Sequence, residues 1–181
     1  MKKRIFSLIV AAITLMVTFA SPDASAQSWR GQKSVGLRGG FTTRNTTATA
    51  GLYFSYRFTE HFRFAPKVDY AFRHKGIDAF SFNFDTEMPI ALDGTTGRVN
   101  FYPIAGLNYS TFTSHNDEGP VEELDENNDD SSQRTSRFGL NFGAGIEYFA
   151  TPTLRLAFES KFLLMKQYSG GWFNVSIGYV F

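Results

Sequence analysis

The chain has 181 residues, which is enough for one domain and short for two. It contains no cysteine, which excludes disulfides, thiolate metal sites, a thiol nucleophile and the processed N-terminal cysteine of a bacterial lipoprotein. The formal net charge of +1 gives no electrostatic basis for nucleic-acid binding, which would need a clear basic excess on one face.

The beginning of the chain has the layout of a secretory signal peptide. A basic start at Lys2–Arg4 precedes the largely apolar stretch Ile5–Ala20, and Ala24-Ser25-Ala26 is an A-x-A cleavage site. An uncleaved membrane anchor is the alternative, but this apolar stretch is shorter than the ~20 residues that a spanning helix needs. We therefore predict export, a signal peptide at residues 1–26 cleaved after Ala26, and one mature domain at 27–181.

Aromatic residues are unusually frequent, yet the chain as a whole is not apolar. They make up 17% of the sequence, while the mean hydropathy is −0.20. After residue 26 no apolar run is long enough for a membrane helix. Apolar and polar residues are therefore interleaved, and β-strands interleave them with a period of two.

Eight segments show this alternation, each close to the ten residues of a tilted membrane strand. In the clearest one, Phe173–Phe181, every odd position is apolar and Val180 is the only apolar even position. The fifth segment is noisier, because Tyr102 and Ile104 fall on its otherwise polar face. The eight predicted strands lie near residues 35–41, 51–58, 62–73, 80–90, 99–111, 137–148, 154–164 and 173–181.

The connections differ in length. Those at 59–61, 93–97 and 151–153 are short, whereas the one at 113–136 is long and rich in carboxylates. If both termini are periplasmic, the short turns are periplasmic and the long loop points outward, as in outer-membrane barrels. Bound Ca²⁺ is one interpretation of the carboxylates, but they lack EF-hand spacing. A solvated surface loop that could contact an extracellular partner is the better interpretation.

The two faces of the predicted strands favour a barrel in lipid. One face is continuously aromatic, whereas the other mixes small residues with opposite charges, which suits a narrow, filled lumen. In hydrocarbon every backbone polar group must be paired, so the sheet must close on itself. We predict an all-β fold, an eight-stranded antiparallel transmembrane β-barrel; a soluble sandwich or barrel is the alternative. Pro66, Pro89 and Pro103 fit poorly inside strands, and we expect strand ends, bulges or register shifts there.

Charged residues on the inward face form the main candidate site. An unpaired buried charge costs several kcal/mol, so charges enclosed by eight strands must pair. A salt-bridge network that plugs the lumen is the favoured interpretation, and a narrow ion pathway is the alternative. The predicted lumen charges are Arg38, Arg57, Arg63, Lys67, Asp69, Arg73, Asp85, Glu87, Arg137, Glu147, Arg155, Glu159 and Lys161.

The end of the chain carries a family resemblance. Phe181, with Tyr179, Ile177 and Phe173 before it, resembles the C-terminal signature of outer-membrane barrels, which in that family is read by the barrel assembly machinery. The stretch Asn100–Tyr109 resembles a segment of the porin-like and OmpA-like superfamily, especially its Bacteroidetes members. The resemblance implies a multi-pass protein of the bacterial outer membrane that contacts its lipid and lipopolysaccharide.

We expect a structural or surface-interaction role, such as loop-mediated binding or envelope integrity, for a monomer without a cofactor. A low-conductance pore for ions or small solutes is the alternative. A lipid A-modifying enzyme is less favoured, because His61, His74 and His115 are scattered and show no metal-binding spacing. His74 lies near Ser81 in sequence, but nothing else marks a catalytic triad.

Overall fold

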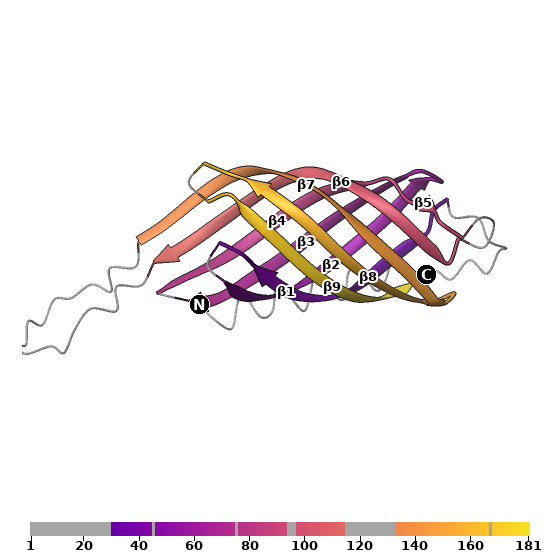
Figure 1. Ribbon diagram of the computed structural model, residues 1–181, viewed down its shortest axis with the longest axis horizontal. Helices are drawn as coiled ribbons and strands as arrows, with labels where there is room; N and C mark the ends of the chain where they lie inside the picture. Colours follow the sequence, from indigo (N-terminus) through magenta and orange to yellow (C-terminus); the bar gives the residue numbers. More distant parts are fainter. Residues whose placement is uncertain (1–29, 45, 75, 94–96, 115–132, 167) are drawn as a thin grey trace, which may run out of the picture.

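The computed structural model describes residues 30–44, 46–74, 76–93, 97–114, 133–166 and 168–181. These residues form one antiparallel sheet, and Figure 1 shows its strands crossing the molecule at a steep tilt. The strands are β1 (Lys33–Thr42), β2 (Thr47–Thr59), β3 (Phe62–His74), β4 (Ile77–Glu87), β5 (Ile90–Ala91), β6 (Val99–Ser114), β7 (Gln133–Thr151), β8 (Leu154–Leu164) and β9 (Gly170–Val180).

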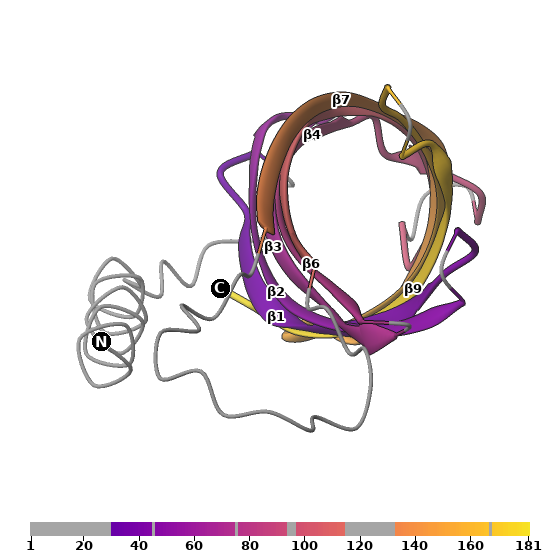
Figure 2. The same ribbon diagram turned by 90° about the vertical axis from the view of Figure 1, so that its left-hand side faces the viewer.

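The sheet closes into a barrel. β1 pairs with both β2 and β9, and β4 pairs with β6, so the first and last strands meet and the ring has no open side. β5 is a two-residue segment that pairs with β6 in continuation of β4, so the nine segments make eight barrel strands. Figure 2 shows the closed ring from one end. The prediction of an eight-stranded antiparallel barrel is confirmed. In the ranges described, no helix is long and apolar enough to cross a membrane.

The barrel is apolar outside and polar inside, the reverse of a soluble protein. Leu37, Phe142 and Phe158 are 62%, 48% and 46% exposed on the outer wall, along with most other large apolar side chains. The alternate residues of the same strands are buried and mostly polar. A soluble β-sandwich would bury the aromatic face, so the exposed aromatic wall is suited to a hydrocarbon environment.

The three prolines inside the predicted strands lie at two interruptions of the hydrogen-bond ladders. Pro66 is paired with Phe84 on β4, but the β2–β3 pairing skips the step at Pro66, where the missing N–H would be needed. Pro89 separates β4 from β5, and on β6 Pro103 lies beside the same gap. Across this gap the N–H of Met88 still donates to the Pro103 carbonyl, at 3.2 Å.

The two ends of the described chain meet at one end of the barrel. The N–H of Phe181 donates to the Lys33 carbonyl at 2.9 Å, and the N–H of Lys33 donates back at 3.0 Å. β6 and β7 reach the opposite end, to the left in Figure 1. They are longer than predicted, because Thr111–Ser114 of β6 pairs with Gln133–Ser136 of β7, so that residues 113–114 and 133–136 belong to the strands and not to the loop. The remaining loop, 115–132, and the predicted signal peptide, 1–26, lie outside the described residues.

If the outer wall faces lipid, the cost of placing a charge on it should depend on the depth of that position in the bilayer. Phe142→Arg, at the centre of β7, should lower the free energy of unfolding by about 2–4 kcal/mol, because the charge would face the bilayer midplane. Tyr148→Arg, on the same face near the end of β7, should cost about 0–1 kcal/mol. Urea unfolding in phospholipid vesicles measures both changes, and equal costs would contradict membrane burial of this wall.

Candidate functional site

The lumen collects most of the charges that were predicted to face inward. Eleven of the thirteen are at most 5% exposed, and two are not. The prediction for Arg73 is wrong: a register shift between Ala71 and His74 interrupts the alternation, and Arg73 is exposed. Arg137 is only half-buried, toward the end of the barrel where β7 begins. The eleven buried charges are Arg38, Arg57, Arg63, Lys67, Asp69, Asp85, Glu87, Glu147, Arg155, Glu159 and Lys161.

Glu147 on β7 is the centre of the first group of contacts. Its Oε2 accepts a hydrogen bond from Arg63 Nη1 at 2.7 Å and another from Arg155 Nε at 2.6 Å. Its Oε1 accepts from the amide of Asn100 at 3.1 Å. Arg63 also donates to Glu87 Oε2 at 2.6 Å. Residues from β3, β4, β6, β7 and β8 are thus joined across the lumen.

Lys67 on β3 joins this group to a second one. Its ammonium lies 2.9 Å from both carboxylate oxygens of Glu159, 2.8 Å from Glu87 Oε1 and 3.2 Å from Asp85 Oδ2. Lys161 reaches the same oxygen of Asp85 at 3.3 Å. A single lysine therefore contacts three carboxylates from β4 and β8, which no pairwise reading of the sequence would specify.

Arg38 on β1 completes the ring of ion pairs. Its Nε lies 3.1 Å from Asp69 Oδ1, and its Nη2 lies 3.2 Å from Glu159 Oε2. Asp69 accepts a further hydrogen bond from the amide of Asn83 at 2.9 Å. β1, β3, β4 and β8 are linked in this way, so the network spans both sides of the junction between β1 and β9.

Uncharged polar side chains continue the network toward the end of the barrel opposite Phe181. The Asn83 carbonyl oxygen accepts from the amides of Asn108 and Asn141, both at 2.8 Å, and from Lys161 at 3.0 Å. Beyond it, the hydroxyls of Ser81 and Ser110 are 2.7 Å apart. These asparagines and serines were not among the predicted site residues, although the alternation already placed Ser81, Asn83 and Asn141 on the inward face.

Tyr102 explains the noisy segment of β6. The side chain is fully buried in the lumen, where its hydroxyl donates to Glu159 Oε1 at 3.2 Å and its ring lies 4.9 Å from the Arg63 guanidinium carbon. Gly145 is directly opposite on β7, and a Cβ there would overlap the Tyr102 ring. Gly178 gives room in the same way to Tyr53. Such inward glycines are the sequence signal for bulky neighbours in the lumen.

An apolar cluster fills the lumen near the end opposite Phe181. Leu163, Met165 and Trp172 are at most 6% exposed, and Phe112 and Tyr168 pack against them. The rings of Phe112 and Tyr168 stack at 4.2 Å, and the Arg44 guanidinium lies 4.8 Å from the centre of the Tyr168 ring. The described lumen is therefore charged toward the chain termini, polar in the middle and apolar toward the other end.

The buried charges nearly balance. Six cations and five carboxylates are buried, and Arg57 donates from Nε and Nη2 to the Glu60 carbonyl, at 3.2 and 2.6 Å. The other five cations each lie within 3.3 Å of a carboxylate oxygen. Among the residues placed in the structure, no group of three or more His, Asp or Glu is arranged to hold a metal ion. The described lumen therefore holds a nearly balanced network of paired charges.

The C-terminal signature residues lie on the opposite, lipid-facing side of β9. Ile177 and Tyr179 are 50% and 57% exposed, and Phe173 and Phe181 are half-buried. Phe173 stacks on Phe41 of β1 at 5.1 Å between ring centres, which strengthens the junction between the first and last strands. The four residues thus share the outer wall, where a partner in the membrane could reach them.

Removal of the central carboxylate should destabilise the barrel strongly. Glu147→Gln keeps the shape but leaves Arg63 and Arg155 without their shared charge, at a cost of about 3–5 kcal/mol in unfolding free energy. Glu60→Gln is the matched control, because that side chain is exposed, and it should change stability by less than about 0.5 kcal/mol. Urea unfolding in vesicles measures both; similar midpoints would rule out a structural role for the network.

Comparisons with known proteins agree with the geometry. The outer membrane protein beta-barrel domain family matches residues 11–181. The N-terminal β-barrel domain of OprF from Pseudomonas aeruginosa is similar in structure, with a TM-score of 0.65 and 16% identity over 84% of this chain and 98% of that one. No curated protein sequence matches.

Two further solved structures have the same fold. Neisserial surface protein A has a TM-score of 0.61 and 14% identity over 85% of this chain and 98% of its own. Ail, the attachment invasion locus protein of Yersinia pestis, has a TM-score of 0.53 and 15% identity over 84% and 99%. The family match covers nearly the whole sequence, whereas these structures show the fold. The chain belongs to the outer membrane protein beta-barrel domain family and is an integral protein of the bacterial outer membrane.

Proposed function

We propose that this protein is a closed, non-conducting outer-membrane barrel with a structural or surface-interaction role. The observation that carries the proposal is the continuous set of ion pairs across the lumen, centred on Glu147, Lys67 and Asp85. Eight strands enclose an interior that side chains can just fill, whereas water-filled pores need more strands. The lumen therefore serves to hold the barrel together.

An ion pathway through this lumen would be costly to open. Lys67 would have to leave three carboxylates, and Tyr102 would have to leave its place beside Gly145. Separating a buried ion pair costs several kcal/mol, and each separation would uncover another buried charge. The apolar cluster of Leu163, Met165 and Trp172 adds a second barrier without polar groups for an ion.

If the lumen is a plug, partners must be met from outside the barrel. We propose an orientation with both termini periplasmic, which directs the acidic 113–136 connection outward. An extracellular partner of that loop, lipopolysaccharide around the wall, and the assembly machinery at Phe173, Ile177, Tyr179 and Phe181 are the proposed contacts of a monomer. Two proteins of the same fold are described as a surface protein and an attachment protein, which is compatible with this role.

We also propose that the protein is not an enzyme. Ser81, which lies near His74 in sequence, is fully buried in the lumen. Its hydroxyl oxygen lies 2.7 Å from that of Ser110. A lipid substrate in the membrane could not reach it there. The remaining histidine of the described ranges, His61, lies in the exposed turn between β2 and β3.

Planar-bilayer recording tests the plug directly. The purified protein should give no steady single-channel steps, because the buried ion pairs and the apolar cluster block the lumen. A triple variant, Tyr102→Ala with Lys67→Ala and Trp172→Ala, removes a fully buried aromatic filler, the central cation and the bulkiest side chain of the apolar cluster, and should produce conductance if it folds. Steady steps from the unmodified protein would overturn the proposal in favour of a low-conductance pore.

Single cysteines test the orientation, because the natural chain has none. Asp125→Cys, in the 113–136 connection, should react with a membrane-impermeant maleimide on whole cells. Glu60→Cys, in the exposed turn between β2 and β3, should react only after the outer membrane is opened. The reverse pattern would show that the termini face outward.

A further inference from the structure

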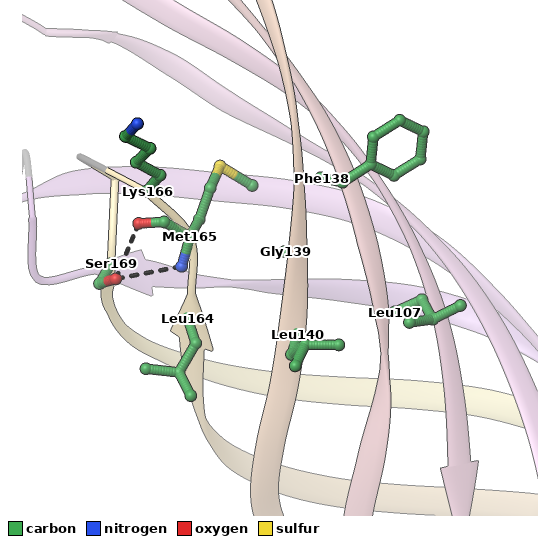
Figure 3. A pocket seen from close by; sticks show the side chains of 8 residues that line it. All are labelled: Leu107, Phe138, Gly139, Leu140, Leu164, Met165, Lys166 and Ser169. Atoms are coloured by element: carbon green, nitrogen blue, oxygen red, sulfur yellow. Dashed lines mark hydrogen bonds between the residues drawn. The ribbon is translucent and has the colours of Figure 1, made fainter.

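A groove on the outer wall lies across β6, β7 and β8, toward the end of the barrel opposite Phe181. Figure 3 shows it from close by, with leucine side chains from three strands along one side and Phe138 and Lys166 beyond them. It is separate from the lumen network, because these side chains alternate with the buried ones along each strand. What occupies the groove must therefore come from the membrane side.

The apolar part of the groove is a regular row. Leu107 is paired with Leu140, and Leu140 with Leu164, so the three side chains stand side by side on adjacent strands. They are 59%, 45% and 46% exposed. Phe138, two residues or about 7 Å further along β7, is 80% exposed and lies 4.9 Å from Tyr109 between ring centres. This surface suits a hydrocarbon chain.

The polar part is a braced turn that carries a lysine. Ser169 Oγ donates to the Met165 carbonyl at 2.9 Å and accepts from the Met165 N–H at 3.0 Å, and the N–H of Tyr168 donates to the same carbonyl at 3.0 Å. Met165 itself is anchored in the apolar cluster of the lumen. Lys166 follows it and is exposed, and Figure 3 shows it pointing away from Leu164.

A second exposed cation lies on the same outer face. Arg134 is four residues, or about 13 Å, beyond Phe138 on β7 and shares its outward parity. Within the parts of β6, β7 and β8 at this end that the structure describes (107–114, 133–142 and 160–166), there is no aspartate or glutamate. The groove therefore offers an apolar row that ends in positive charge, and its complement is an acylated anion.

We propose that the groove binds a bisphosphorylated, multiply acylated glycolipid of the outer leaflet. One acyl chain lies along Leu107, Leu140 and Leu164, and the headgroup phosphates contact Lys166 and Arg134. Two separated cations suit a headgroup with two phosphates better than a phospholipid with one. This assignment rests on the orientation proposed above, since an inverted barrel would place the groove in the periplasmic leaflet.

Lipid titration followed by native mass spectrometry tests the site. The mature protein, refolded in a non-ionic detergent, is titrated with bisphosphoryl lipid A, its fully dephosphorylated form and phosphatidylglycerol. Bisphosphoryl lipid A should bind at least tenfold more tightly than the other two. Equal binding of the dephosphorylated form, or of phosphatidylglycerol, would overturn the proposal.

Matched variants locate the binding. Lys166→Gln with Arg134→Gln should weaken lipid A binding about tenfold, while Arg98→Gln, an exposed cation at the other end of the barrel, should not. Leu140→Ala should weaken it about threefold, and Leu156→Ala, exposed nearer the termini on β8, should leave it unchanged. A heat-dependent shift on SDS gels shows that each variant is folded.

An identical affinity for the Lys166/Arg134 double variant and for Arg98→Gln would refute the site. The measurement is made in detergent, so its result does not depend on conductance or on orientation in cells. The two proposals can therefore fail separately. Lipid titration tests the binding site, whereas cysteine labelling tests only the orientation of the barrel.

Discussion

The pairing of charges inside a narrow, closed sheet is the constraint on which the rest of this structure depends. Lipid outside leaves no water for the backbone, so the strands must close on themselves. Closure with eight strands leaves an interior about as wide as the side chains that line it. Charges enclosed there are stable only with partners, and Glu147, Lys67 and Asp85 each contact two or more charged groups from other strands.

The same constraint explains why the two faces follow different rules. On the outer wall, residues need only be apolar, and the phenylalanines there have few specific contacts beyond neighbours such as Phe41 and Phe173. In the lumen each residue depends on the shape of the residue opposite. Tyr102 needs Gly145, and Tyr53 needs Gly178. A side chain larger than glycine at position 145 or 178 would therefore displace the tyrosine beside it, even though the two residues are far apart in sequence.

This difference determines what could be predicted from sequence. The period of two placed eight strands and eleven of the buried charges, because parity is a local property of each strand. It failed at Arg73, where the register shift after Ala71 changes the parity within one strand. The partners of each charge were not predictable, because contacts such as Lys67 with Glu159 depend on how the barrel closes.

The prolines are a second case in which the sequence could not predict how neighbouring strands are paired. Pro66 and Pro103 looked incompatible with a closed barrel, since each lacks an N–H for the ladder. The structure places Pro89 and Pro103 at one shared gap between β4 and β5, so two missing donors interrupt one ladder at one place. Local sequence identified the problem, and only the register shows that the two prolines share a single interruption.

The charged side chains of the lumen are engaged with one another. Contacts with other molecules are therefore expected on the outer wall and at the ends of the barrel. Substitutions in the network act first on folding, since each buried charge that loses its partner destabilises the whole ring. Lys166 and Arg134 are different, because both are exposed and Lys166 lies beside the apolar row of the groove. Their positive charge is not required by the buried network, which is why a ligand from the surrounding leaflet accounts for it better than a structural role does.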